Sequence, residues 1–297
     1  MRINAALGIK AALLSALVCA SCSSLPSTEK VSTFGSAAAN TATALQAAVA
    51  ADRTIGLQIG QEEEADKFLQ NKKYTLADTS DAILNKRSLS AQLAALKALQ
   101  DYGKALAKAA DQGVIDSLEQ ASTQLGASVG NLGATAFPTY APVIGPVVKI
   151  ASEGTGWLLG NRYAAEIHSI IVARNEDVKR LAALLKRDMP VILRELNDQV
   201  FIFEERRQSS LDRVQEDPKV TKLELYHEFK AARQDTSAVK ALVVAARGYN
   251  DLLDSLVAAH DALAKDDPNA DVLIARFQIL STDVAALIAA LRAEKQS

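Results

Sequence analysis

The clearest indication of fold class comes from residues 239–263, VKALVVAARGYNDLLDSLVAAHDAL. Apolar side chains recur there at steps of three and four residues, which is the spacing of one face of an α-helix. Such a face requires another apolar surface to cover it. The residues on it are Val239, Leu242, Ala246, Tyr249, Leu253, Leu256, His260 and Leu263. We expect His260 to be a partly buried residue with a hydrogen-bond partner, with pH sensing as the alternative.

The same spacing continues outward from this stretch along most of the chain. Hydrophobic residues make up 49% of the 297 residues, and no segment alternates between apolar and polar residues as a strand would. The pattern predicts an all-α protein, an elongated antiparallel helical bundle with long coiled-coil-like helices. Its other ladders are Leu89, Leu93, Leu96, Leu99 and Leu106; Val178, Leu181, Leu185, Met189, Ile192, Leu196, Val200 and Phe203; and Leu273, Phe277, Leu280, Val284, Leu287 and Leu291.

Prolines and turn residues set the expected limits of the helices. Asp217-Pro218 and Asp267-Pro268 each resemble an N-cap followed by proline in the first helical turn. Pro190 falls inside a regular ladder, so a kink is expected there and not an end. Residues 234–236 are the expected place of any further break. The expected helices are 37–70, 88–111, 114–135, 147–216, 219–264 and 269–295, with a loop or short helix before residue 88 and a turn at 137–146.

The first 21 residues have the organisation of an export signal. Arg2 and Lys10 make the first ten residues positively charged, and residues 11–18, AALLSALV, form a short apolar run after them. That run is too short to span a bilayer, which needs about 20 apolar residues, and it is typical of a signal peptide. We therefore assign residues 1–21 to a signal peptide, 22–36 to a flexible tether and 37–297 to a single helical-bundle domain.

Val18-Cys19-Ala20-Ser21-Cys22 resembles the lipobox of bacterial lipoproteins. The resemblance implies that Cys22 receives a diacylglyceryl group and that the signal peptide is removed just before it. Two or three acyl chains would then hold the protein firmly in a membrane. Ser23 resembles the residue that follows the cysteine in lipoproteins of the Gram-negative outer membrane. Two interpretations stay open: modification of Cys19, and ordinary signal cleavage after Ala20.

Residues 120–162 depart from the helical background. No charged residue occurs between Gln120 and Val148, and glycine and proline are concentrated in and just after this stretch. Small residues four apart let two helices approach closely, so we predict an apolar hairpin that sets Gly126 opposite Gly160 and Gly130 opposite Gly156. The residues assigned to hairpin packing or membrane insertion are Gly126, Gly130, Pro142, Gly156, Trp157 and Gly160.

A long bundle with an apolar head between helices resembles the architecture of α-helical pore-forming toxins, and the resemblance implies insertion of this hairpin into a membrane. Lys149 and Glu153 oppose insertion, because each charge would cost about 2.5–3.5 kcal/mol at a bilayer centre. We therefore expect the hairpin to be packed within the bundle or an oligomer. Insertion is the alternative. Trp157 is expected to be a buried or partly buried core residue, with a membrane-interface anchor as its alternative role.

The sequence offers little support for catalysis. Gly126-Ala127-Ser128-Val129-Gly130 matches the G-x-S-x-G nucleophile elbow, but that motif requires a strand before the serine, and a helix is predicted there. The three histidines lack the spacing of a zinc hydrolase. Both cysteines lie in the first 22 residues, so no cysteine metal site is expected in the body of the protein. No cofactor or metal is predicted.

The charge does not indicate nucleic-acid binding, since the formal net charge is −2. The acidic run Glu62-Glu63-Glu64 is expected to be a solvated helix face. The basic stretch 174–187, RNEDVKRLAALLKR, is also expected to be solvated, with docking of a partner as the alternative.

These observations together predict a non-enzymatic protein. We expect an exported lipoprotein, held at the bacterial outer membrane by its lipid, that serves as a scaffold, adaptor or assembly component of the cell envelope. Its helical faces would bind a protein partner or further copies of the chain, with no small-molecule substrate. The alternative function is a membrane-active or pore-forming protein that inserts residues 120–162.

Overall fold

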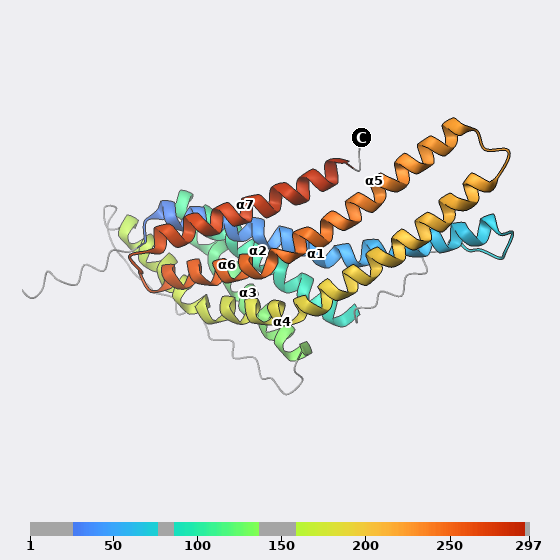
Figure 1. Ribbon diagram of the computed structural model, residues 1–297. Coiled ribbons are helices and arrows are strands. Elements are labelled where there is room, and N and C mark those ends of the chain that lie inside the picture. The colour runs from blue at the N-terminus through green and yellow to red at the C-terminus, as the bar shows by residue number, and fades with distance from the viewer. Residues whose placement is uncertain (1–25, 77–85, 137–158, 295–297) are drawn as a thin grey trace, which may run out of the picture.

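The computed structural model describes residues 26–76, 86–136 and 159–294. In these ranges the chain forms seven α-helices and no strand, which confirms the all-α bundle (Figure 1). The helices are α1 (Thr28–Leu69), α2 (Lys86–Gln112), α3 (Ile115–Ala136), α4 (Leu159–Glu216), α5 (Lys222–Arg247), α6 (Tyr249–Ala264) and α7 (Ala270–Glu294).

The molecule has a broad end and a narrow end, as Figure 1 shows. At the broad end the first half of α1 packs with α2, α7 and the first half of α4, while α3 and α6 pack against these helices. At the narrow end, α1, α4 and α5 are the described helices that continue. We call this part the arm and define it as residues 56–76, 197–216 and 222–240. Since α1 has 42 residues, it is about 63 Å long and extends from one end of the molecule to the other.

The first helix begins earlier than the sequence predicts. Ser27 accepts a hydrogen bond from the backbone N–H of Lys30 and so caps α1. Val31 and Phe34 are buried in the main core, so residues 28–36 are not a flexible tether. The assignment was wrong because serine, threonine and glycine surround these two apolar residues. A short polar segment with a sparse helical pattern resembles a linker when its partner helix is unknown.

Two other expected boundaries are corrected. The chain stays helical through residues 234–236 and is interrupted at Gly248, between α5 and α6. Glycine is a poor helix former because its backbone is the freest to leave the helix. By contrast, α4 continues through Pro190 as predicted.

The two Asp-Pro pairs lie in turns before their helices and not in the first helical turn. At the start of α5 the cap is Thr221: its hydroxyl accepts from the backbone N–H of Glu224, and the Glu224 carboxylate accepts from the N–H of Thr221 at 2.8 Å. This reciprocal pair is a capping box. Before α7, Asp267 accepts from the backbone N–H of Asn269 at 2.7 Å. Each aspartate therefore shapes the turn, and its helix begins after it.

Helices α1 and α2 cross with their backbones very close together. A Cβ atom at Gly35 would lie 2.5 Å from the carbonyl oxygen of Gly103, and one at Gly103 would lie 2.5 Å from the carbonyl oxygen of Gly35. Only two glycines allow backbones to come so near. Ala38 and Leu106 pack around the crossing and are buried. This crossing fixes the position of α2 along α1.

The arm is held by polar contacts as well as by apolar packing. Glu62 of α1 accepts hydrogen bonds from Arg207 and Ser210 of α4, each at 3.2 Å. Asp66 forms an ion pair with Arg213 one turn further along. The acidic run Glu62-Glu63-Glu64 is therefore solvated only in part, because Glu62 faces α4. Beyond Ile55, α1 contributes no buried apolar residue within the described part of the chain, so the core thins toward the tip.

Candidate functional site

A buried polar cluster lies where α2, α4 and α6 meet at the broad end. His260 is on the buried face of α6, Tyr102 is on α2 and Asn175 is on α4. His260 and Tyr102 are fully buried, and Asn175 nearly so. The helical spacing that puts Leu256 and Leu263 in the core also carries His260 there, so its ring must find partners inside the protein.

The partners of His260 define its protonation. The Asp261 carboxylate can only accept, so the side-chain amide of Asn175 donates to it at 2.8 Å. The amide oxygen of Asn175 then faces Nδ1 of His260 at 3.1 Å, which places the ring proton on Nδ1. Nε2 of His260 therefore accepts from the hydroxyl of Tyr102, also at 3.1 Å. These bonds form one chain that runs from Tyr102 outward to Asp261.

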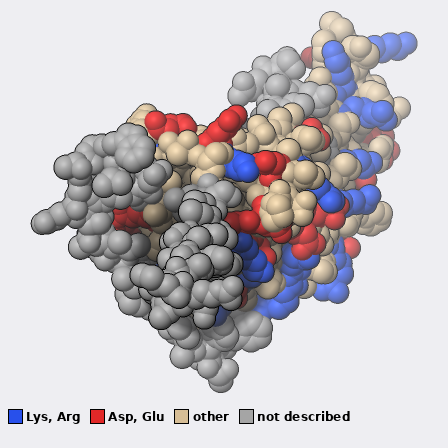
Figure 2. Space-filling view, turned by 90° about the vertical axis from the view of Figure 1, so that its left-hand side faces the viewer, with Lys and Arg blue, Asp and Glu red and all other residues tan. Residues whose placement is uncertain are grey.

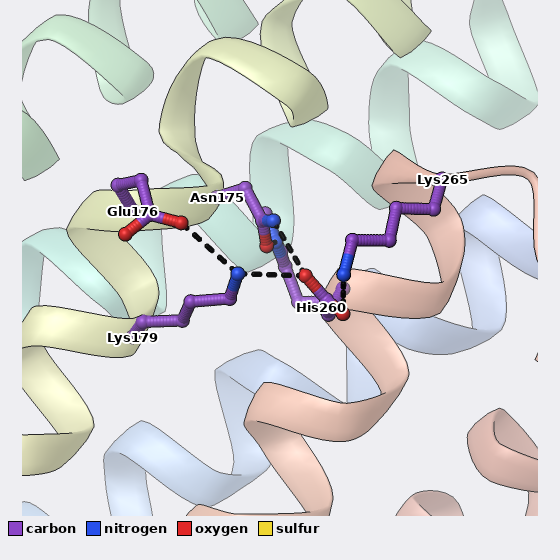
Figure 3. Close-up of polar contacts among 6 residues, drawn as sticks. Asn175, Glu176, Lys179, His260 and Lys265 are labelled. Carbon is purple, nitrogen blue, oxygen red and sulfur yellow. Dashed lines mark hydrogen bonds and ion pairs between the residues drawn. The ribbon is translucent and has the colours of Figure 1, made fainter.

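The outer end of this chain is neutralised by lysines. Asp261 forms ion pairs with Lys179 of α4 and Lys265, each at 2.7 Å, and Figure 3 shows the two ammonium groups approaching from opposite sides. Glu176 binds Lys179 at 3.0 Å on the other side. The hydrogen bonds from Lys179, Lys265 and Asn175 hold the pKa of Asp261 well below its usual range. The cluster therefore ends in a carboxylate that stays charged.

Burial keeps the side chains of His260 and Tyr102 uncharged, in contrast to Asp261. Loss of water around the ring lowers the pKa of His260 from 6.5 to about 3, so the imidazole is neutral at ordinary pH. The same loss raises the pKa of Tyr102 far above its usual value. The inner part of the cluster thus carries no charge on its ring groups. It joins three helices through neutral hydrogen bonds.

A buried ion pair lies beside this cluster, and it needs the space left by Gly126, a residue that the sequence assigned to hairpin packing. Arg174 of α4 is only 2% exposed, and its Nη1 lies 2.8 Å from Oδ2 of Asp177. A Cβ atom at Gly126 of α3 would lie 2.5 Å from that Nη1. Gly126 therefore makes room for the guanidinium group. The structure places it opposite Arg174 and Asp177 and not, as the hairpin symmetry predicted, opposite Gly160.

The expectation for the basic stretch 174–187 is accordingly corrected. Its first residues, Arg174, Asn175 and Asp177, are buried, whereas Lys186 lies at the surface in an ion pair with Asp254. Composition alone suggested a solvated face, because charged residues are rarely buried without a partner. Arg174 and Asp177 pair with each other across one turn of α4, whereas Asn175 finds its partners, His260 and Asp261, on α6. No spacing within 174–187 could show that another helix covers this face.

The remaining residues assigned to the hairpin are only partly covered by the described residues. Gly130 is buried on α3, and Gly160 lies in the first turn of α4. Pro142, Gly156 and Trp157 lie outside the described residues, as does Cys22. None of the described helices has an apolar stretch long enough to cross a membrane.

The cluster has no geometry for catalysis on a substrate from solution, since the His260 ring and Tyr102 have no exposed surface. Within the described ranges, no group of three His, Cys, Asp or Glu side chains could hold a metal ion. Ser128 lies in the middle of α3, without the strand-to-helix turn that a nucleophile elbow needs. The cluster can hold α2, α4 and α6 in one arrangement, because each of its hydrogen bonds needs a specific donor and acceptor on these helices.

The surface offers a different kind of candidate, which the sequence did not reveal. Large apolar side chains are exposed at the tip of the arm, with Leu76 95% and Leu223 66% exposed. The others there are Phe68, Leu69, Tyr74, Tyr226 and Phe229. These residues lie off the predicted ladders. The sequence does hold a signal for them: a leucine or aromatic residue near the end of a predicted helix that does not fall on that helix's apolar ladder.

Charge does not single out a site at the broad end. Figure 2 views the molecule from that end, and the acidic and basic side chains visible on it are interspersed. Such a surface has no extended field of one sign, in line with the formal net charge of −2.

Comparisons of this chain with protein-family models, with curated proteins and with solved structures give no match.

Proposed function

We propose that the chain is a lipid-anchored, non-enzymatic scaffold or adaptor of the bacterial cell envelope, attached through Cys22 to the outer membrane, and that the tip of its arm binds a protein partner. The observation that carries the proposal is the group of exposed apolar side chains at the tip. It lies at the end of the molecule opposite the beginning of α1 (Figure 1).

The distance between anchor and tip supports this role. Cys22 precedes the first residue of α1 by six positions, and six extended residues reach at most about 20 Å. From there α1 carries the chain about 63 Å to its last residue, Leu69. The lipid would therefore hold the broad end close to the membrane. The tip would stay accessible to a protein that does not touch the anchor.

The composition of the tip suits a protein partner. Phe68 and Tyr74 contact each other edge to face, with ring centroids 5.2 Å apart, and both remain exposed. Tyr226 and Phe229 add two aromatic rings on α5. Aromatic side chains dominate the binding energy of many protein interfaces, and exposed apolar side chains of this size are available to such a contact.

Site-specific photo-crosslinking in intact envelopes tests the proposal. A photoreactive side chain at Tyr226 should give an adduct of one defined mass, because the partner covers this position. The same group at Lys186, a partly exposed residue on α4, serves as control and should not give that adduct. Leu223→Glu should remove the adduct by placing a charge in the contact, and Cys22→Ser should remove it by releasing the anchor. An adduct equally strong at Lys186, or none from the anchored protein, would contradict the proposal.

The membrane-active alternative is opposed by the packing of α3. Leu118, Leu125, Val129 and Leu132 are buried in the main core, so insertion would first have to withdraw them. Leakage of liposomes by the delipidated protein, abolished by Gly130→Glu, would favour the alternative over the scaffold.

A further inference from the structure

The last helix has two apolar faces, and only one of them is covered. Ile274 and Phe277 of α7 are buried against the bundle, and Phe277 is a residue of the predicted ladder. On the opposite side Val272 is 69% and Ile279 is 61% exposed. Leu287, which the sequence placed on the inward ladder, is also exposed. A helix that is apolar on both sides is normally buried on both sides.

The exposed face has the spacing of a second coiled-coil seam. Its residues follow one another at steps of three, four, three and four, and all of them are exposed. They are Val272, Ala275, Ile279, Thr282 and Ala286. Steps of this kind put side chains in a line along which a second helix can pack. Because alanine and threonine are small, that helix could approach closely.

Two charges beside this seam indicate what the second helix is. Arg276 and Asp283 are one heptad apart, and each directly follows a seam residue, Ala275 or Thr282. Both are exposed, and neither forms an ion pair within the described part of the chain. On one helix they are about 10 Å apart along the axis, too far to bind each other. They are of opposite sign and occupy equivalent heptad positions.

An antiparallel copy of the same helix satisfies both charges. In that arrangement Arg276 lies opposite Asp283 of the second copy, and symmetry repeats the pair in reverse. In this register Ile279 faces Thr282 and Ala275 faces Ala286 of the second copy, each pair offset from exact alignment by two residues, about 3 Å along the axis. A parallel copy would instead set equivalent positions level, with Arg276 and Asp283 still one heptad apart. Of these two arrangements, the charge pattern thus complements itself only in the antiparallel one, whose twofold axis is perpendicular to the helix.

We infer that the outward face of α7 is the contact between two copies of this chain, packed antiparallel about a twofold axis near Leu280. This deepens the proposed function by naming one partner, and it rests on that proposal only for the membrane setting. Since α7 runs along the long axis of the molecule (Figure 1), the two arms would extend in opposite directions. Both lipid anchors could enter one membrane if the dimer lies along its surface.

Sedimentation velocity of the full chain in a density-matched detergent tests the inference. The unmodified chain should sediment as a dimer. Arg276→Asp or Asp283→Arg alone should weaken the dimer about tenfold or more, because each places like charges opposite each other twice. An equal mixture of these two variants should dimerise again, since one copy then carries two acids and the other two bases. A mixture that stays monomeric would overturn the antiparallel register.

Substitutions of the apolar residues complete the test. Ile279→Glu should give a monomer, while Leu223→Glu at the arm tip is the matched control and should remain a dimer. Both positions are exposed, so thermal unfolding followed by circular dichroism should show that both variants fold. An unmodified chain that sediments as a monomer, or a dimer that survives Ile279→Glu, would overturn the inference. No other envelope protein is present in this measurement, so its failure would leave the crosslinking at Tyr226 unaffected, and the reverse also holds.

Discussion

At the scale of single residues, the buried polar side chains around His260 are each tied to a specific partner on another helix. His260 occupies a position that the ladder would give to leucine, and it is tolerated because Tyr102 and Asn175 satisfy both ring nitrogens. An unpaired polar group at this depth would cost about 1–3 kcal/mol. The cluster therefore selects one rotation and one height of α6 relative to α2 and α4.

The neutral state of His260 predicts how stability depends on pH. Its pKa is lowered in the folded protein from 6.5 to about 3, so between these values the unfolded chain binds more protons. Stability should therefore fall on acidification, by about 2 kcal/mol between pH 6.5 and 4.5. The Asp261 carboxylate affects stability at lower pH. Its pKa in the folded protein is depressed below 3.8, so it stabilises the fold above pH 3.8, and this stabilisation is lost as the pH falls further.

Urea unfolding at a series of pH values measures this dependence. His260→Gln keeps one donor and one acceptor but no titrating proton, so its free energy of unfolding should lose this component of the slope between pH 6.5 and 4.5. An equal slope in both proteins would show that another group is responsible.

At the scale of helices, the contacts are set by small residues as much as by large ones. Gly35 and Gly103 allow α1 and α2 to cross, and Gly126 allows Arg174 to lie between α3 and α4. Gly113 has a positive φ of 68° and lets the chain turn from α2 into α3, with its N–H donating to Ala109 at 2.9 Å. These glycines have three different roles: a close crossing, room for a side chain and a turn. The number of glycines in the sequence therefore does not indicate which role each one has.

Replacing glycine by alanine should have opposite effects at two positions on the helices of this crossing. Gly103→Ala should destabilise the protein by about 1–3 kcal/mol, because the new methyl group meets the backbone of α1. Gly56→Ala is the matched control: a Cβ atom there meets nothing within 4 Å, so it should stabilise α1 by about 0.5–1 kcal/mol. Free energies of unfolding in urea measure both. Equal stabilisation by the two substitutions would show that the helices do not cross this closely in solution.

At the scale of the whole molecule, stability should decrease from the broad end to the tip. The broad end contains most of the buried residues, whereas the arm has three helices, few buried apolar side chains and the polar contacts of Glu62 and Asp66. Local opening requires less free energy where fewer contacts are broken. The arm can therefore open or adapt to a partner without loss of the main core.

Amide hydrogen exchange should reveal this gradient. Residues 205–216 and 222–235 should exchange faster than α2 and α6. Phe203→Ala removes a buried side chain at the base of the arm and should raise exchange in those two segments while leaving α2 protected. Leu125→Ala, a buried control in the main core, should instead lower protection throughout. Uniform exchange in both variants would indicate that arm and bundle unfold as one unit.

The all-α class, most helix limits and most of the inward faces could be predicted from the sequence, because helical spacing shows which side of each helix is apolar. Lipid attachment at Cys22 and the hairpin residues Pro142, Gly156 and Trp157 stay predictions from the sequence. The packing of the helices was needed to show that Phe34 belongs to the core, that Arg174 is buried beside Gly126, and that a second apolar face of α7 is uncovered. Periodicity describes one helix at a time, whereas burial of a charge, a close crossing or an uncovered face depends on which other helix lies opposite.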